Sequence, residues 1–223
     1  TQVKVSDGAV REIVAAYTRE SGVRVLERKL AAICRKAAMK IVDGEKTVKI
    51  TEKDLHEYLG APRYFPERQA LEERVGVVNG LAWTSVGGEL LEVEVNVVPG
   101  SGKVELTGNL GDVMKESAHA ALSFIRSQAE RLGISQNFYK EKDIHVHFPE
   151  GAVPKDGPSA GIAITTAIVS ALTGVPVRRG LAMTGEVTLR GRVLPIGGLK
   201  EKTMAAFRNG IRTVIIPADN EKD

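Results

Sequence analysis

Apolar residues recur at helical spacing through the first 60 residues of the chain. They predict amphipathic helices over residues 7–21 and 24–42, because positions three and four apart share one helix face. The apolar stripe of the second helix consists of Leu26, Leu30, Ile33, Ala37 and Ile41. Residues 47–50 are typical of a short strand and 51–59 of a third helix opening on an N-cap threonine. The pattern predicts a small, mostly helical domain over residues 1–60.

After residue 74 the pattern changes to short runs rich in β-branched residues, separated by glycine and proline. These runs predict strands over residues 75–82, 90–98, 103–107, 143–148, 181–189 and 213–216. Helical spacing returns over residues 112–132, 159–173 and 199–209. Strands and helices interleave without a regular βαβ repeat, which favours an α+β fold with a mixed sheet over residues 75–223. Residues 61–74, with two prolines and a charged end, form the predicted linker.

Composition is that of an ordinary globular protein, with 43% hydrophobic and 26% charged residues in a chain of 223. No apolar run approaches the roughly 18 residues of a membrane span, and the N-terminus lacks the features of a signal peptide. The single cysteine, Cys34, excludes an intrachain disulfide and fits a reducing compartment. Because free cysteines are usually buried, we expect Cys34 to be a core thiol.

The net charge of +3 arises in the first third, where residues 1–74 carry 15 basic and 12 acidic side chains. Residues 75–223 carry 16 of each. This asymmetry indicates two joined units and allows a weak affinity of the first for polyanions such as DNA. A solvated helix surface explains the same charges more simply.

Residues 99–103, Pro-Gly-Ser-Gly-Lys, resemble part of a phosphate-binding loop. The full P-loop pattern requires Gly at position 97 and Ser or Thr at 104, where this chain has Val97 and Val104. The segment also lies between two predicted strands, so we interpret it as a hairpin turn. No other P-loop pattern occurs in the sequence, and the chain is not expected to hydrolyse ATP by itself.

The four histidines offer no convincing general base or metal site. His145 and His147 share one face of a predicted strand, but no third ligand is evident, so we expect polar residues that are solvated or hydrogen-bonded. His56 and His119 lie on predicted helices without a partner motif for nucleophilic catalysis.

Ser159 lies in the segment Pro154–Gly161, at the start of a strongly apolar helix. The free N–H groups of such a helix start can stabilise an oxyanion, and Gly157 and Gly161 allow a substrate backbone to approach closely. Two alternatives remain open from these residues alone. Serine is a favoured N-cap, and a glycine-rich helix start can also bind phosphate, as in a small-molecule kinase.

Lysine can replace histidine as the base that activates a serine. Lys200 and Lys202 lie at opposite edges of the apolar stripe of the predicted helix 199–209, and periodicity does not choose between them. Burial of either amine would lower its pKa, as a base working near neutral pH requires. The usual alternative for a lysine at a helix edge is that its ammonium reaches solvent.

Three ordered motifs give the chain a specific resemblance. They are residues 154–161, Pro-Lys-Asp-Gly-Pro-Ser-Ala-Gly; residues 183–186, Met-Thr-Gly-Glu; and residues 194–202, Leu-Pro-Ile-Gly-Gly-Leu-Lys-Glu-Lys. Together with Asp143–His147 upstream, they resemble the proteolytic domain of the ATP-dependent Lon proteases. Residues 1–60 look like the small helical subdomain that closes the AAA+ module in that family. The implied proteolytic domain spans residues 75–223, with a fold like ribosomal protein S5 domain 2.

The resemblance implies a role for several residues. The family's nucleophile falls on Ser159 and its base on Lys202. Thr184 matches the threonine whose hydroxyl holds the lysine amine, and Asp156 an acidic residue implicated in how the site closes. Arg24 matches the sensor-2 arginine that reaches a nucleotide bound by the neighbouring core; its alternative is a solvated helix start. Further expected contacts with the oxyanion or the substrate backbone come from Gly157, Pro158 and Ala160.

The activity implied by the resemblance is that of a serine endopeptidase that degrades unfolded, damaged or tagged proteins as a homo-hexamer. It would lie in the cytoplasm, or in the mitochondrial matrix for some members. Peptide-bond chemistry would need no metal or cofactor, and ATP and Mg²⁺ would be bound mainly by a nucleotide-binding core that this chain lacks. On this interpretation the chain is a fragment, short of its extreme C-terminus, that at most cleaves peptides or loosely folded proteins without ATP.

Overall fold

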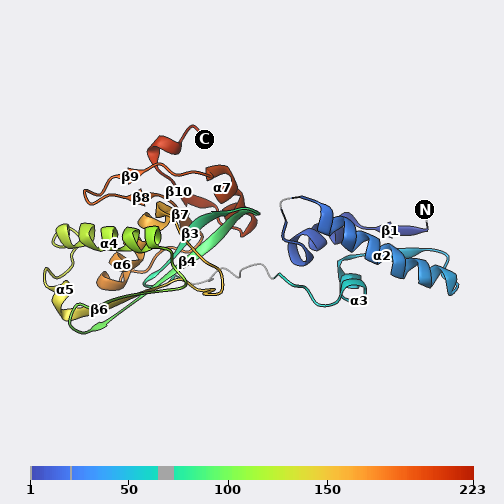
Figure 1. Ribbon diagram of the computed structural model, residues 1–223, viewed down its shortest axis with the longest axis horizontal. Coiled ribbons are helices and arrows are strands. Elements are labelled where there is room, and N and C mark those ends of the chain that lie inside the picture. Colours follow the sequence, from blue (N-terminus) through green and yellow to red (C-terminus); the bar gives the residue numbers. More distant parts are fainter. Residues whose placement is uncertain (1, 21, 65–72) are drawn as a thin grey trace. The chain divides into compact units, whose positions relative to one another are not determined.

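The computed structural model describes residues 2–20, 22–64 and 73–223 of the chain (Figure 1). The chain divides into two units, residues 1–67 and 68–223, and each is described by itself. Much of the predicted linker, residues 65–72, lies outside the described residues. Within the described ranges, none of the helices combines the length and apolar character that crossing a bilayer requires.

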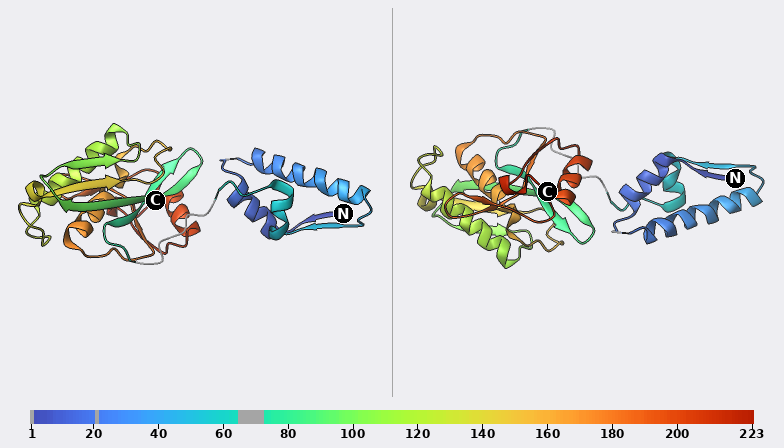
Figure 2. Two further views of the ribbon diagram at one scale, coloured as in Figure 1. Left: turned by 90° about the horizontal axis from the view of Figure 1, so that it is seen from below. Right: turned by 90° about the horizontal axis from the view of Figure 1, so that it is seen from above.

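The smaller unit packs short helices around one long helix and a two-stranded parallel sheet. Its helical elements are α1 (Asp7–Glu12), the π-helical turn η1 (Ile13–Tyr17), α2 (Arg24–Val42), the 3₁₀ turn η2 (Glu52–Asp54) and α3 (Leu55–Leu59). Strands β1 (Val3–Val5) and β2 (Val48–Ile50) pair in parallel and lie beside α2 (Figure 2). The core is formed by Ala9, Ile13, Ala16, Tyr17, Ile33, Ala37, Val48, Ile50, Leu55 and Tyr58.

Local patterning predicted most of this unit. The helix over residues 24–42 is confirmed, and so is the N-cap at Thr51, whose N–H donates to the Asp54 carboxylate at 2.8 Å. The first helix was predicted too long. Its regular part ends at Glu12, and the Ala16 carbonyl at the end of the π turn accepts from the N–H groups of Arg63 and Tyr64. Hydrogen bonds from residues 63 and 64 therefore occupy the Ala16 carbonyl, which a longer helix would have used within itself.

Two further features of the smaller unit differ from the sequence analysis. Strand β1 was not predicted, because three residues carry too little periodicity and depend on pairing with β2. The prediction that Cys34 is a core thiol is wrong, since Cys34 is exposed. The buried positions next to it on α2 are Ile33 and Ala37, and one residue along a helix turns the side chain by about 100°.

The larger unit is built on a mixed six-stranded sheet. Its strands, in spatial order, are β10 (Thr213–Ile215), β7 (Leu181–Met183), β3 (Val77–Thr84), β4 (Gly87–Pro99), β6 (Lys142–His147) and β5 (Val104–Thr107). Strand β4 is antiparallel to both of its neighbours, and the other pairings are parallel. A separate antiparallel pair is formed by β8 (Glu186–Val187) and β9 (Val193–Leu194). The α+β class with a mixed sheet is confirmed.

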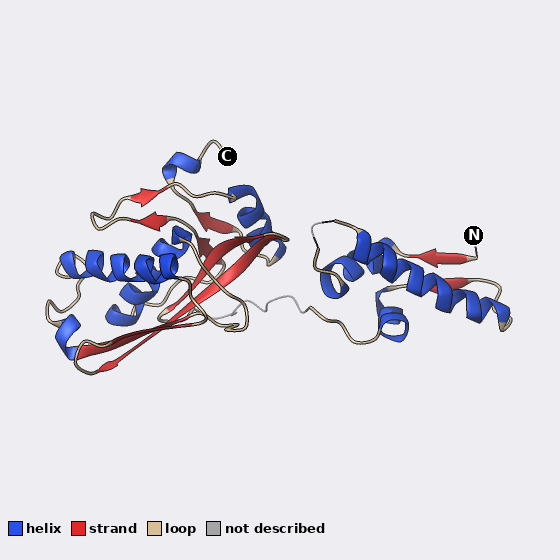
Figure 3. Ribbon diagram, in the orientation of Figure 1, coloured by secondary structure: helices blue, strands red, loops and turns tan. Residues whose placement is uncertain are grey.

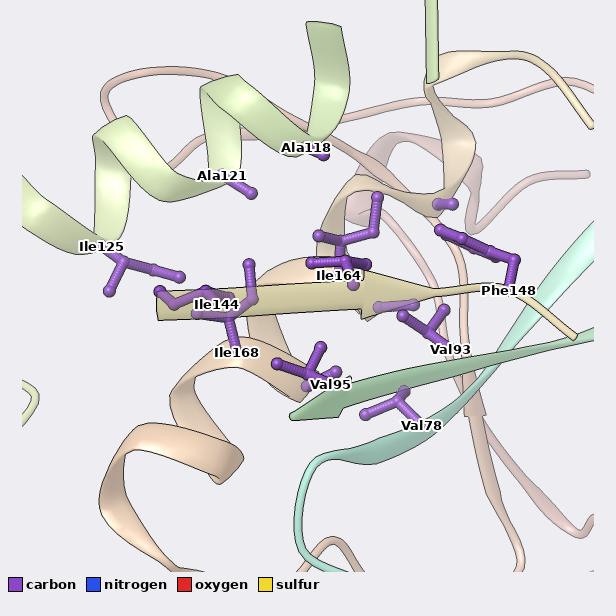
Figure 4. Close-up of a cluster of buried hydrophobic side chains, with 14 of the residues drawn as sticks. Val78, Val93, Val95, Ala118, Ala121, Ile125, Ile144, Phe148, Ile164 and Ile168 are labelled. Carbon is purple, nitrogen blue, oxygen red and sulfur yellow. The ribbon is translucent and has the colours of Figure 1, made fainter. Parts of the chain in front are cut away.

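Helices cover both faces of this sheet (Figure 3). The helical elements are α4 (Asp112–Ser127), α5 (Phe138–Glu141), the 3₁₀ turn η3 (Pro158–Ala160), α6 (Gly161–Thr173), α7 (Leu199–Arg208) and the 3₁₀ turn η4 (Ala218–Asn220). On one face α4 and α6 pack together, and their side chains share a core with Val78, Val93, Val95 and Ile144 of the sheet (Figure 4). On the other face α7 contributes Ala206 to a smaller cluster with Leu81 and Ala182.

The sheet order corrects the interpretation of residues 99–103 as a hairpin turn. Strands β4 and β5 do not pair, because β6 lies between them. The segment instead wraps around the start of β6, where one oxygen of the Asp143 carboxylate accepts from the N–H groups of Ser101, Gly102 and Lys103 at 2.8–3.0 Å. These bonds lower the pKa of Asp143, with the bond from Lys103 the largest cause. An internal carboxylate therefore occupies the amides that resembled a phosphate loop.

Two predicted elements of the larger unit are shorter than their apolar patterns suggested. The helix predicted over residues 112–132 ends at Ser127. Turns then follow, and Gly133 at φ +70° helps return Ile134 to the core. The strand predicted over residues 181–189 is two strands, β7 and β8, belonging to different sheets. Between them lie Thr184 and Gly185, both buried.

Candidate active site

Ser159 lies in the 3₁₀ turn η3, immediately before helix α6. The N-cap position of α6 is Ala160, and that of η3 is Gly157, with no side-chain capping bond at either. The alternative that Ser159 is an N-cap is therefore wrong. Its side chain is half-buried. The first N–H groups of a helical turn have no acceptor within it, and Pro158 carries none. The N–H groups of Ser159 and Ala160 are thus the donors at this turn.

Asp156 attaches the segment before Ser159 to helix α4. Its carboxylate accepts from the N–H of Met114, in the first turn of α4, at 3.0 Å, and from the N–H of Gly157 at 2.8 Å. A Cβ on Gly111 would lie 2.3 Å from this carboxyl carbon, so the approach requires glycine. The Gly157 N–H is therefore bonded within the loop. The Asp156 carboxylate lies at the N-terminus of α4, where the helix dipole favours a negative charge.

Lys202 enters the site from helix α7. Its side chain is only 2% exposed, whereas Lys200 is exposed, so tertiary structure distinguishes the two candidates that periodicity left open. The Lys202 Nζ donates to the hydroxyl of Thr184 at 3.3 Å. Burial lowers the pKa of Lys202 from 10.5 to about 8, because desolvation penalises the ammonium form. A substantial fraction of this amine is therefore neutral near pH 8.

Thr184 connects the lysine to the serine segment. It follows β7, is completely buried, and its hydroxyl donates to the main-chain carbonyl of Ser159 at 3.2 Å while accepting from Lys202. The N–H of Gly185 donates to the same carbonyl at 2.8 Å, and its own carbonyl accepts from the N–H of Ile162 at 3.0 Å. Hydrogen bonds thus link Ser159, Thr184 and Lys202, although the serine and the lysine are 43 positions apart in the sequence.

Gly161 is where the serine segment packs most closely on its neighbours. A Cβ there would lie 2.8 Å from the Val187 main-chain nitrogen and 3.0 Å from the Ser117 hydroxyl oxygen. Ser117 is buried on α4, and its hydroxyl donates to the Pro158 carbonyl at 3.4 Å. The sequence analysis missed Ser117, and no local signal marks it, because only the packing of α4 beside η3 gives it a role.

The variant Gly161→Ala is expected to reduce turnover at least about tenfold and the free energy of unfolding by about 1–3 kcal/mol, since the added methyl must displace β8 or α4. Peptide hydrolysis and urea unfolding would measure the two effects. Gly22→Ala, in the smaller unit, is the control, because nothing lies within 4 Å of its Cβ and its φ is not positive. Parent-like turnover in Gly161→Ala would show that this close approach does not control the site.

Arg24 is the first residue of α2 and is exposed. The N–H groups that follow it are already capped, since the Glu20 carboxylate accepts from Val25 at 2.9 Å and from Leu26 at 3.0 Å. The backbone hydrogen bond from Val25 is the largest cause of a lowered pKa at Glu20. The N–H groups at the start of α2 are therefore capped by the Glu20 carboxylate, and the Arg24 side chain is exposed to solvent.

The remaining candidates from the sequence do not join this site. His145 Nε2 and His147 Nδ1 both hydrogen-bond to the Thr107 hydroxyl, at 2.8 and 2.7 Å, which confirms the interpretation of bonded polar residues. Over residues 2–20, 22–64 and 73–223, no group of three or more His, Cys, Asp or Glu side chains could hold a metal ion.

Comparison with known proteins finds two family models that together cover the chain. A model of the Lon protease AAA+ ATPase lid domain matches residues 1–50, and a model of the Lon protease (S16) C-terminal proteolytic domain matches residues 49–223. Lon protease 1 of Bacillus subtilis is 59% identical over 225 aligned residues, which cover 100% of this chain and 29% of the relative.

Lon protease of Nitratidesulfovibrio vulgaris is 57% identical, with 100% of this chain and 28% of the relative covered. Lon protease 1 of Myxococcus xanthus is 56% identical, with 100% and 27% covered. The chain thus spans little more than a quarter of the length of these curated relatives. The chain belongs to the Lon protease family, and its larger unit is the serine endopeptidase domain of that family.

Proposed function

We propose that this chain cleaves peptide bonds with a Ser159–Lys202 catalytic dyad. The observation that carries the proposal is the contact of one buried hydroxyl, Thr184, with both the Lys202 amine and the Ser159 main chain. A buried lysine has a lowered pKa here and is linked through one hydroxyl to the main chain of a half-buried serine. These are properties of a general base for nucleophilic catalysis. Neither a solvated lysine nor a capping serine requires this arrangement.

Thr184 orients the lysine. Its hydroxyl proton is directed to the Ser159 carbonyl, so its oxygen lone pairs remain to accept an N–H from Lys202. A neutral amine has two N–H bonds and one lone pair. With one N–H held by Thr184, the lone pair is restricted in direction and can be presented to the Ser159 hydroxyl. Asp156 holds the other side of the serine segment through its bond to Met114.

The reaction then proceeds in two halves. Neutral Lys202 accepts the proton of the Ser159 hydroxyl as the serine oxygen attacks the substrate carbonyl carbon, and N–H groups at the η3 turn stabilise the oxyanion. The Lys202 ammonium next protonates the leaving amine, and an acyl-enzyme remains. A water molecule, losing its proton to Lys202, attacks the ester carbonyl and releases Ser159. Each proton taken by the lysine is returned, and no step in this scheme requires a metal.

The wider biological role follows from family membership and extends beyond this chain. We propose unfolded, damaged or tagged proteins as substrates, a homo-hexamer as the active assembly and the cytoplasm as the location. ATP and Mg²⁺ would be bound mainly by residues outside this chain, with Arg24 contributing a phosphate contact from its exposed position on α2. Weak DNA binding by residues 1–74 is a further proposal, resting on their excess of three positive charges (15 − 12).

A peptide boronate separates this function from its rivals. We expect ATP-independent hydrolysis of a fluorogenic peptide, blocked by the boronate, because a boronate forms a tetrahedral adduct with an activated serine. A phosphate-binding kinase site would instead bind nucleotide and ignore the boronate. A polyanion-binding module would bind DNA in a salt-sensitive way without turnover. Nucleotide binding without boronate binding or turnover would reject the proposal.

A further inference from the structure

Lys155, four residues before Ser159, has an unusual set of partners. Its Nζ donates to three main-chain carbonyls, those of Glu150 at 2.6 Å, Val153 at 3.1 Å and Gly108 at 3.4 Å. Other lysines of the described residues, such as Lys40 and Lys103, pair with carboxylates at the surface. No ion pair found in the described part of the chain includes Lys155. Its charge is thus directed at carbonyl dipoles, two in the loop before the serine and one at Gly108.

The main chain of Lys155 is tied to the same neighbouring loop. Its N–H donates to the Asn109 carbonyl at 3.0 Å, and its carbonyl accepts from the Gly111 N–H at 2.7 Å. Leu110 and Lys155 accordingly form an isolated parallel bridge. The ammonium and the backbone therefore fasten residues 150–155 to residues 108–111 at several points. The next residue, Asp156, continues the attachment to α4.

Two residues that accept hydrogen bonds from Lys155 have positive φ. Asn109, at φ +60°, and Glu150, at φ +62°, are the non-glycine residues with positive φ among those the structure describes. Asparagine tolerates this region, whereas glutamate ordinarily avoids it. The Glu150 carbonyl makes the shortest of the three bonds to Lys155. The ammonium thus stabilises a backbone conformation that the residue would otherwise avoid, and strain of this kind is often found at functional sites.

The roles of Lys155 and Lys202 require opposite protonation states of their amines. Three acceptors use all three N–H bonds of an ammonium, whereas a neutral amine has only two. Lys155 must therefore stay protonated to keep its contacts, even though burial lowers its pKa. It has no lone pair for catalysis. Lys202, with one hydroxyl partner, has the free lone pair that a base needs.

We propose that Lys155 is a positioning residue for Ser159, folding residues 150–157 into the one arrangement that presents the serine hydroxyl to Lys202. The inference rests on the proposed Ser159–Lys202 mechanism. Misplacement of a reacting group by about 1 Å can cost about 10²-fold in rate. Loss of the ammonium is thus expected to lower kcat more than it raises KM, because the loop sets the geometry of reaction.

The test compares three substitutions at Lys155 in the intact chain. Lys155→Met is expected to lower kcat about 10²-fold with KM within about threefold of the parent. In Lys155→Ala, propylammonium ions should restore part of kcat in a saturable way, by donating to the three vacant carbonyls. Lys155→Arg keeps the charge but spreads its donors over a planar fork. It should fold like the parent and still lose activity. Lys103→Met, an exposed lysine, is the unaffected control.

Two readouts distinguish positioning from plain stability. The pH at which kcat reaches half its maximum should not move in any Lys155 variant, because Lys202 remains the titrating base. The kcat deficit should also persist well below the melting temperature. Parent-like kcat in Lys155→Met or Lys155→Arg, or a failure of propylammonium to rescue folded Lys155→Ala, would overturn the inference. Turnover surviving Ser159→Ala would instead overturn the proposed function itself.

Discussion

Replacing Ser159 by alanine is expected to lower peptide hydrolysis by roughly 10³-fold or more, because no other group supplies the attacking oxygen. The fold should be unaffected. The serine side chain is half-buried and caps neither η3 nor α6, so its removal leaves no helix end without a side-chain partner. Initial rates with a fluorogenic peptide, together with circular dichroism and thermal unfolding, would measure both effects.

The control for Ser159→Ala is Ser123→Ala. Ser123 is exposed on α4, where its hydroxyl donates to the His119 carbonyl one turn earlier at 2.9 Å. It should leave activity and melting temperature unchanged. A folded Ser159→Ala variant that keeps more than about a tenth of parental kcat would contradict nucleophilic catalysis by this residue, since loss of a nucleophile costs orders of magnitude.

Lys202→Met is expected to remove activity and to make the protein more stable at pH 7. Turnover should fall roughly 10³-fold, because the serine loses its base. The free energy of unfolding should rise by about 2 kcal/mol, because burying a charged amine carries a cost that methionine avoids. A substitution that raises stability and removes activity indicates a residue kept for catalysis at a cost in stability, whereas replacing a structural residue lowers stability.

The gain in unfolding free energy of Lys202→Met over the parent is expected to decrease as pH rises. The pKa of Lys202 is about 8 in the folded protein and ordinarily 10.5. Below pH 8 both the folded and the unfolded chain hold the proton, and the folded state bears the whole cost of the buried charge. Between pH 8 and 10.5 the unfolded chain binds more protons, so the parent becomes more stable as pH rises. The advantage of Lys202→Met should therefore shrink across that window.

Urea unfolding of parent and variant at pH 7 and pH 10 would measure this difference, and the parental kcat should rise with pH through about 8. Lys200→Met is the matched control, because Lys200 lies on the same helix but is exposed. It should change neither activity nor the pH dependence of stability. A difference between parent and Lys202→Met that is independent of pH would show that Lys202 is not a buried titrating amine.

Local periodicity was sufficient to predict the elements in which the repeat extends over many adjacent residues. Helix α2 was predicted to the residue, and most strands of the larger unit within two or three residues, because burial of one face imposes a repeat that adjacent residues carry. Ordered motifs also pointed to Ser159, Thr184 and Lys202 before any contact between them was known. The spacing of these residues along the chain does not itself imply contact.

Other features depend on contacts between segments far apart in the sequence, and periodicity could not predict them. Periodicity placed Lys200 and Lys202 at two edges of one stripe. Only the packing of α7 on the sheet buries Lys202, and this burial lowers its pKa. No local sequence pattern indicates that β6 lies between β4 and β5. Because of this strand order, residues 99–103 form a loop around Asp143 instead of the predicted hairpin turn. Side-chain spacing reports which face of an element is buried, whereas strand order, desolvation and the contacts of Lys155 arise only when segments far apart in sequence meet.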